Sequence, residues 1–182
     1  MVALRSDAAR NRARILEAAR DLANRSETLA LNAVAQAAGV GVGTVYRHFT
    51  TVEELEETLV WERFDELAEI LDSTGPTHLE RVLTAHFALL VEDELFERVT
   101  SRANPALEQT TALITELTDR MAKLMDRARA EGSLRDDIDA AGVLTLVCGV
   151  ARAARTADLA AEGPQAQLLL RVVLDGLGTR PT

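Results

Sequence analysis

Residues 39–49 constrain the fold of this chain more than any other stretch. They read Gly-Val-Gly-Val-Gly-Thr-Val-Tyr-Arg-His-Phe, with small residues at one end and large polar or aromatic residues at the other. A short amphipathic segment, residues 32–38, precedes them and ends at Gly39, a residue type that readily adopts the left-handed conformation that closes a helix. Two short helices joined through a glycine are typical of a helix-turn-helix, whose second helix enters the major groove of DNA.

The composition favours an all-helical protein. Apolar residues make up 47 % of the 182 residues and aromatic residues only 3 %, whereas a sheet protein would be richer in Val, Ile, Tyr and Thr. The 4 prolines and 10 glycines leave few interruptions for long helices. The apolar spacing predicts helices at about residues 7–25, 30–38, 41–49, 52–73, 78–92, 94–102, 106–131, 140–162 and 164–176.

The charge distribution divides the chain into two parts. The net charge of −9 is unusual for a nucleic-acid-binding protein, but residues 1–50 carry +3 and residues 51–182 carry −12. DNA is attracted by the basic surface that lies next to it, so the acidic residues 51–182 disfavour only non-specific binding. We therefore expect a DNA-binding domain at residues 1–55 and a second domain at residues 56–182, with a boundary inside or just after the fourth helix.

Other classes of protein are disfavoured by the residues that the chain lacks. The single cysteine, Cys148, excludes an internal disulfide network and a cysteine-based zinc site. Histidines 48, 78 and 86 offer little general-base chemistry, and no Ser/His/Asp, Cys/His or paired-carboxylate signature stands out. His78 and His86 would lie ~12 Å apart along one helix, too far to share a metal ion. With no secretion signal and no apolar run of about 18 residues, we expect a cytoplasmic protein that is not an enzyme and has no metal, cofactor or membrane partner.

The stretch from residue 15 to residue 59 closely resembles the DNA-binding domain of the TetR family of bacterial transcription regulators. The matching segments are residues 15–19, 34–40, 43–49 and 53–55. The resemblance implies an all-α, TetR-like fold of about nine helices, with a three-helix helix-turn-helix domain followed by a helical bundle that binds a ligand and dimerises. It also implies a homodimer that binds double-stranded DNA, usually a repressor released from a palindromic operator by a small-molecule inducer.

The expected recognition helix has small residues where it would approach DNA closely. Gly41 and Gly43 leave room and offer backbone N–H groups to phosphate, and Thr44 adds a hydroxyl and a methyl group. The expected DNA-binding residues are Arg12, Gly41, Val42, Gly43, Thr44, Tyr46, Arg47 and His48. By resemblance, the residues that contact the DNA backbone are Thr44, Tyr46 and His48. Those close to the bases are Val42, Gly43 and Arg47.

Three positions depart from the family's pattern. Gly41 stands where Ser is common, Ala30 where Thr usually caps the second helix, and Val52 where Lys often reaches a phosphate. DNA binding would then depend more on an N-terminal arm that follows the minor groove or the flanking phosphates. The arginines of this arm are Arg5, Arg10, Arg12 and Arg14. Two alternatives stay open: the arm is only a solvated helix face, and the chain is a helical adaptor or sensor that has lost sequence-specific DNA binding.

The second domain offers candidates for an inducer pocket. They are the large or polarisable residues near the centre of the helical half: Trp61, Phe64, His86, Phe87, Leu90, Leu117, Met121, Met125 and Cys148. Each could also be an ordinary core residue. The few aromatic residues favour an aliphatic cavity, so we expect an apolar or amphipathic inducer.

The last two predicted helices are the expected dimer interface. The final one is apolar nearly all round, so it must be buried on two sides. The interface residues are expected to include Leu144, Val147, Ala151, Leu169, Leu170, Val173 and Leu177. The alternative is that these residues form an intramolecular core.

Overall fold

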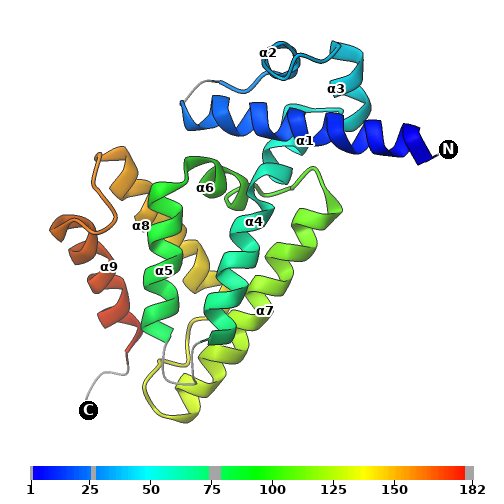
Figure 1. Cartoon of the computed structure of the whole chain (residues 1–182). Helices are drawn as coiled ribbons and strands as arrows, with labels where there is room; N and C mark the ends of the chain where they lie inside the picture. Colours follow the sequence, from blue (N-terminus) through cyan, green and yellow to red (C-terminus); the bar gives the residue numbers. More distant parts are fainter. Residues whose placement is uncertain (1, 26–27, 74–78, 179–182) are drawn as a thin grey trace. The chain divides into compact units, whose positions relative to one another are not determined.

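The computed structural model describes residues 2–25, 28–73 and 79–178, and the side chains of residues 7–25, 28–72 and 79–178. The described chain is all-α, as predicted (Figure 1). Its helices are α1 (Val2–Asn24), α2 (Leu31–Ala37), α3 (Val42–His48), α4 (Val52–Ser73), α5 (Leu79–Glu92), α6 (Glu94–Thr100), α7 (Glu108–Ala130), α8 (Ala140–Thr156) and α9 (Pro164–Leu177).

The helices form two compact units. The first unit comprises Met1–Trp61 together with Asn104–Thr110, and the second comprises Glu62–Ala103 together with Thr111–Thr182. The chain therefore leaves the first unit within α4 and returns to it briefly at the start of α7. Nothing in the sequence pattern predicted that residues 104–110 would join the first unit.

Polar side chains fix the starts of several helices. The Thr51 hydroxyl accepts a hydrogen bond from the backbone N–H of Glu54 at 3.2 Å, and the Glu54 carboxylate accepts one from the N–H of Thr50. This reciprocal arrangement resembles a capping box at the start of α4. Asp139 is the N-cap of α8, and its side chain accepts a hydrogen bond from the N–H of Gly142 at 2.7 Å.

The end of α8 differs from the sequence-based expectation. The helix was expected to continue to residue 162, but it ends at Thr156. Asp158 adopts a left-handed conformation (φ 54°), and the N–H of Leu159 bonds the carbonyl of Ala154 at 3.0 Å. These are features of a Schellman motif. Glycine usually occupies the left-handed position, so an aspartate there gave no signal of the helix end.

The first unit is built around α1, α2 and α3, which bury a shared apolar core. Its buried residues include Ile15, Ala19, Leu22, Val34, Val45 and Phe49. Gly39 closes α2 with φ 61°, as predicted, and the N–H of Val40 bonds the carbonyl of Ala35 at 3.0 Å. Arg14 of α1 donates from Nη2 to the carbonyl oxygens of Ala38 and Gly39, at 2.6 and 3.3 Å. A cation therefore lies where the α2 dipole is negative, which ties α1 to the turn.

Replacing Gly39 by alanine is expected to lower the free energy of unfolding by about 1–2 kcal/mol, because a Cβ disfavours the left-handed conformation. An added Cβ would also lie 3.0 Å from Nη2 of Arg14 and disturb its bonds to the turn. Urea denaturation of purified protein measures the loss. Gly43→Ala is the control, since a Cβ there meets nothing within 4 Å and alanine favours the helix by about 0.5–1 kcal/mol. Equal stability of the two variants would contradict the prediction.

The second unit packs α5 against α8 and α9 (Figure 1). Helix α5 contributes the buried residues Val82, Leu83, Phe87 and Leu90. Facing helices contribute Val143, Val147, Ala151, Ala154, Ala166, Leu170, Val173 and Leu177. Among the helices that the structure describes, none has both the length and the apolar character needed to cross a membrane.

Candidate nucleic-acid interface and ligand cavity

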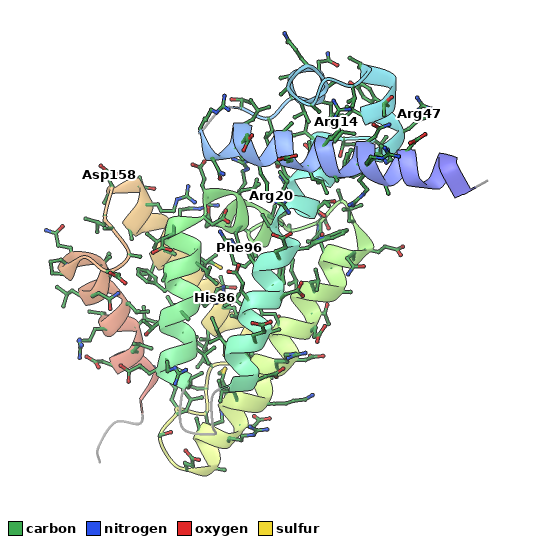
Figure 2. The ribbon with its side chains drawn as sticks, in the orientation of Figure 1. Arg14, Arg20, Arg47, His86, Phe96 and Asp158 are labelled. Carbon is green, nitrogen blue, oxygen red and sulfur yellow. The ribbon has the colours of Figure 1, made fainter. Side chains whose placement is uncertain are left out.

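Helix α3 buries one side and exposes the other. Val45 and Phe49 are buried in the core of the first unit. On the opposite side, Val42 is 43 % exposed and Tyr46 51 % exposed, and Arg47 is exposed as well (Figure 2). An exposed valine and tyrosine on an anchored short helix form a surface suited to contact with a partner rather than with the core.

Arg47 is held along the first turn of α3. Its Nε donates to the carbonyl oxygen of Gly43 at 3.0 Å, and Nη2 donates to the Thr44 hydroxyl at 3.3 Å. A guanidinium has five N–H donors, so donors remain for a base edge or a phosphate. Gly43 is exposed and adds no side chain that would keep a partner at a distance. His48, the last residue of α3, is half-buried.

The arginines of α1 make contacts of their own within the first unit. The Arg12 guanidinium lies 5.5 Å from the centre of the Phe49 ring, a cation–π contact at the end of α3. Arg10 pairs with Asp7 at 2.8 Å in an exposed bridge, which adds little stability. The side chain of Arg5 lies outside the described residues. These positions keep α1 basic beside α3, and Arg14 has the structural role described above.

The three departures from the family pattern lie at helix starts. Gly41 is the N-cap of α3 and Ala30 the N-cap of α2, and neither makes a side-chain cap. Val52 is the first residue of α4. Helices α2 and α3 therefore start without the hydroxyl cap that is common at these positions in the family. Their positions depend instead on the buried core.

A cavity of about 440 Å³ lies within the second unit. Its volume falls in the range of small-molecule sites. It is lined by Phe64, His86, Glu97, Thr100, Ser101, Ile114, Leu117, Thr118, Ala141, Leu144, Thr145, Cys148, Gly149 and Arg152. These residues come from helices α4 to α8, together with Ser101 at the end of α6.

The structure places some of the expected inducer-contacting residues at this cavity and others elsewhere. The lining includes four of them: Phe64, His86, Leu117 and Cys148. The buried residues that are not part of the lining are Phe87, Leu90, Met121 and Met125. Trp61 belongs to the first unit, where its Nε1 donates to the Thr110 hydroxyl at 3.0 Å. Sequence reasoning missed the polar lining residues, among them Glu97, Thr100 and Arg152.

His86 is the most unusual residue of the lining. Its side chain is 2 % exposed, and neither Nδ1 nor Nε2 has a hydrogen-bond partner in the described protein. The ring packs against Phe96, with centroids 6.4 Å apart in an edge-to-face geometry (Figure 2). Burial lowers the pKa of His86 from 6.5 to about 4, so the imidazole is neutral at pH 7.

Because of this low pKa, His86 is expected to make the protein less stable in acid. Because the unfolded chain binds a proton at this residue below about pH 6.5 and the folded chain only below about pH 4, the free energy of unfolding falls as the pH is lowered through this window. Between pH 7 and pH 4.5 the expected contribution is a loss of about 2 kcal/mol. Urea unfolding of the wild type and of His86→Phe at both pH values isolates the contribution of His86. The carboxylates titrate in both proteins, so their contribution cancels in the comparison. Parallel pH dependences would contradict the prediction.

A buried carboxylate lies on another wall of the cavity. Glu97 accepts hydrogen bonds from the Ser101 hydroxyl at 2.8 Å and from Nε of Arg152 at 2.9 Å, and its Oε2 lies 3.5 Å from Nη1 of Arg155. The charge of Glu97 is thereby compensated by the protein. Burial raises the pKa of the nearby Cys148 thiol to about 11, so it stays protonated and uncharged.

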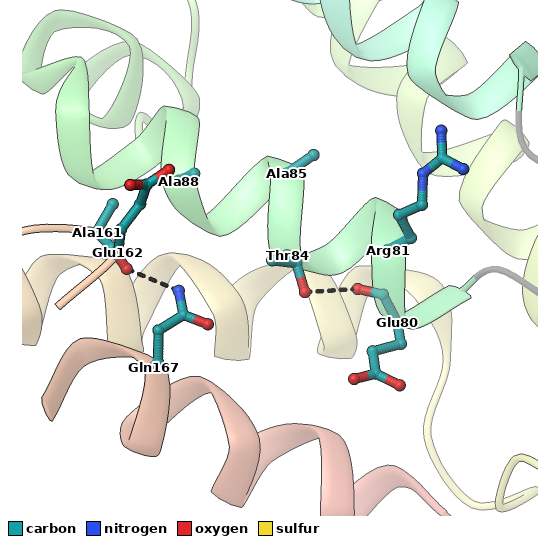
Figure 3. Close-up of a pocket in the computed structure, with 8 residues that line it drawn as sticks. All are labelled: Glu80, Arg81, Thr84, Ala85, Ala88, Ala161, Glu162 and Gln167. Carbon is teal, nitrogen blue, oxygen red and sulfur yellow. Dashed lines mark hydrogen bonds between the residues drawn. The ribbon is translucent and has the colours of Figure 1, made fainter. Parts of the chain in front are cut away.

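A larger hollow of about 780 Å³ lies between α5 and the start of α9 (Figure 3). Two of its polar side chains bond the protein backbone: Thr84 donates to the carbonyl of Glu80 at 2.8 Å, and Gln167 to that of Ala161 at 2.7 Å. The buried polar atoms without a partner in the described residues belong to His86 and Arg155, and neither residue lines this hollow. The smaller cavity is therefore the better candidate ligand site.

In the part of the chain that the structure describes, no group of three or more His, Cys, Asp or Glu side chains could hold a metal ion. His78, considered as a ligand in the sequence analysis, lies outside the described residues.

Four large apolar side chains are exposed on α8 and α9, and together they are called the apolar patch. It consists of Leu146, Leu168, Leu169 and Val172, of which Leu168 and Val172 are 60 % and 65 % exposed. Only Leu169 in this patch belongs to the expected dimer set. The expected interface residues that are buried within the chain's own core are Val147, Ala151, Leu170, Val173 and Leu177. Leu144 lines the cavity.

Both halves of the sequence match known protein families. The family described as "Bacterial regulatory proteins, tetR family" matches residues 15–58. The family described as "Transcriptional regulator SbtR-like, C-terminal domain" matches residues 79–179, more than half of the chain. No curated protein matches the chain.

Solved structures share the fold over nearly the whole chain. RolR in complex with resorcinol aligns with a TM-score of 0.67 at 16 % identity, covering 96 % of this chain and 91 % of that one. The TetR transcriptional regulator SCO0520 from Streptomyces coelicolor aligns with a TM-score of 0.55 at 28 % identity, covering 93 % and 99 %. CprB from S. coelicolor A3(2) aligns with a TM-score of 0.62 at 26 % identity, covering 94 % and 90 %.

Proposed function

Because the chain belongs to the TetR family of bacterial regulators, which are non-enzymatic DNA-binding proteins, we propose that it is a repressor released from DNA by a small molecule. It binds a palindromic operator as a homodimer. The observation that carries this proposal is α3, which exposes Val42, Tyr46 and Arg47 while Val45 and Phe49 anchor it in the core.

The contacts to DNA follow from the exposed side of α3. Tyr46 and the Thr44 hydroxyl contact phosphates, together with His48 at the end of the helix. Val42 and Arg47 lie near base edges, where a guanidinium can form two hydrogen bonds to guanine. Gly41 and Gly43 let the first turn approach the groove closely. Arg12, beside Phe49, adds positive charge from α1.

The homodimer uses the exposed apolar patch of α8 and α9. Leu168 and Val172 are four residues apart and therefore share one face of α9, where Leu169 extends the surface. A two-fold axis through this patch would bury it against its own copy, as a self-complementary interface requires. A palindromic operator demands such symmetry, with recognition helices about 34 Å apart, one turn of DNA.

The inducer binds in the cavity of the second unit. Its wall exposes more hydrocarbon than polar surface, with polar side chains such as Thr100, Thr118 and Thr145 among the lining residues, and small-molecule sites typically combine the two. RolR, a protein of the same fold, was solved with resorcinol bound. The inducer need only prefer the released state over the DNA-bound state by a few kcal/mol to shift the population. A regulator of this kind would act in the cytoplasm, where bacterial DNA is found.

Selection from a randomised duplex library with purified protein at about 100 mM salt tests the proposal. Sequencing should return an enriched palindrome with half-sites about 10 base pairs apart. Sedimentation should show a dimer that Leu168→Glu with Val172→Glu dissociates. If a confirmed dimer enriches no sequence, even at lower salt, the adaptor alternative replaces the repressor.

A further inference from the structure

The imidazole of His86 is a polar group buried without a protein partner. An unpaired buried donor or acceptor costs about 1–3 kcal/mol, so a molecule that bonds it gains that much relative to water. His86 lines the cavity. Among the described residues, neither of its two ring nitrogens has a hydrogen-bond partner. A ligand in this cavity that reached either nitrogen, both of which are buried, would satisfy this unmet hydrogen bond.

The cavity wall exposes mostly hydrocarbon, although several threonines also line it. Phe64, Ile114, Leu117 and Leu144 line the cavity. Phe96 packs edge-to-face on both Phe64 and His86, with centroids 5.2 and 6.4 Å away, so the imidazole is held by rings and not by polar groups. A ligand that bonds His86 must therefore place most of its surface against hydrocarbon.

The charged groups that face the cavity are already compensated. Glu97 of α6 is bonded to Ser101 and Arg152, so a cationic ligand would meet an acceptor already in use. An anionic ligand would lie near the Glu97 carboxylate, and the remaining donors of Arg152 belong to a side chain that is 60 % exposed, where solvent screens the attraction. The Cys148 thiol of α8 is neutral. Burying a further charge without its own partner is costly, so the site favours an uncharged molecule.

A neutral imidazole has one N–H donor and one acceptor nitrogen. A hydroxyl can bond either nitrogen, and a carbonyl oxygen can accept from the N–H. We infer, on the basis of the proposed function, that the inducer is an uncharged, mainly apolar molecule whose hydroxyl or carbonyl oxygen hydrogen-bonds His86. A cavity of about 440 Å³ limits the inducer to a small molecule.

Calorimetric titration of the full-length protein with four probes tests this class. The uncharged probes are 1-octanol and 4-propylphenol, and the charged ones are octanoate and octylammonium. At least one uncharged probe should bind, at least tenfold more tightly than either charged probe. His86→Phe, which keeps a ring and removes both nitrogens, should weaken that probe about tenfold. Arg81→Ala, in the separate hollow of Figure 3, is the control and should leave its affinity unchanged.

Nitrogen NMR of histidine-labelled wild-type protein gives a second readout that needs no variant to bind the probe. The bound uncharged probe should shift the ring-nitrogen signals of His86, which are identified by their absence in His86→Phe. Three outcomes would overturn the inference: tighter binding of a charged probe, no binding of either uncharged probe, or binding that leaves the His86 signals unchanged.

A gel-shift assay with the selected operator separates this inference from the proposed function. If the protein binds the operator but no uncharged probe, the ligand class is wrong and the DNA-binding proposal stands. If it binds an uncharged probe through His86 but enriches no operator, the ligand class stands and the repressor proposal fails.

Discussion

Replacing Tyr46 and Arg47 together by alanine is expected to weaken operator binding by about 1,000-fold or more. Both side chains are exposed on α3, and neither is part of the core of the first unit. One lost contact to DNA typically costs ~1 kcal/mol or more. A symmetric dimer repeats each contact, so the double replacement removes about four contacts and ~4 kcal/mol, which corresponds to about three powers of ten in affinity.

Fluorescence anisotropy with the selected operator at one salt concentration measures this loss. Arg81→Ala is the matched control, because it removes the same charge from an exposed position of α5 and should change affinity less than twofold. The thermal midpoint of the double variant should stay close to that of the wild type. Among single variants, Tyr46→Phe should weaken all sequences alike, whereas Arg47→Ala should relax the preference at one base pair. A loss below tenfold in the double variant would mean that α3 does not read the operator.

The helix-turn-helix could be predicted because its structure depends on neighbours in sequence. Gly39 closes α2 through backbone hydrogen bonds to residues of the preceding turn. Elsewhere in the chain, Thr51 and Asp139 each cap a helix by accepting a hydrogen bond from the backbone N–H three residues later. Burial of Val45 and Phe49 follows from their spacing on one helix. Local patterns of this kind hold whatever the rest of the chain does.

The cavity could be predicted only in part. Phe64, His86, Leu117 and Cys148 stood out by size or chemistry, but a helical pattern does not tell a cavity wall from a filled core. Glu97 and Arg152 escaped notice because charged residues on helices usually face solvent, and their pairing joins residues 55 positions apart. The same limit applies to α9. Its apolar residues face both inward and outward, and only the packing reveals that Leu170 is buried and Val172 exposed.

The carboxylate of Glu57 is the feature of the first unit that the sequence pattern concealed most completely. It is fully buried on α4, and its two oxygens accept hydrogen bonds from the backbone N–H groups of Ala106 and Leu107, at 2.7 and 2.9 Å. These two residues directly precede α7, which begins at Glu108. The N–H groups at a helix start have no partner within the helix, so Glu57 supplies a cap from 49 and 50 residues away. This pairing, with the hydrogen bond from Trp61 to Thr110, ties the segment of residues 104–110 to α4 within the first unit.

Glu57→Ala is therefore expected to lower the free energy of unfolding by about 3 kcal/mol. The substitution removes two hydrogen bonds to a charged acceptor, each worth about 1.5–3 kcal/mol, and partial access of water to the freed N–H groups recovers some of the loss. Glu57→Gln keeps one acceptor oxygen and should lose about half as much. Urea denaturation measures both, with Glu69→Ala, exposed on the same helix, expected to stay within about 0.5 kcal/mol of the wild type.

Hydrogen exchange distinguishes a lost cap from general destabilisation. The amides of Ala106 and Leu107 should lose protection in Glu57→Ala at urea concentrations where the core amides of Ile15 and Val34 still keep theirs, because the capped N–H groups open locally before the whole unit unfolds. A Glu57→Ala variant that loses less than 1 kcal/mol and keeps both amides protected would show that the carboxylate does not hold this segment. Loss of protection at Ala106 and Leu107 together with the expected destabilisation would identify Glu57 as the group that joins the start of α7 to the rest of the first unit.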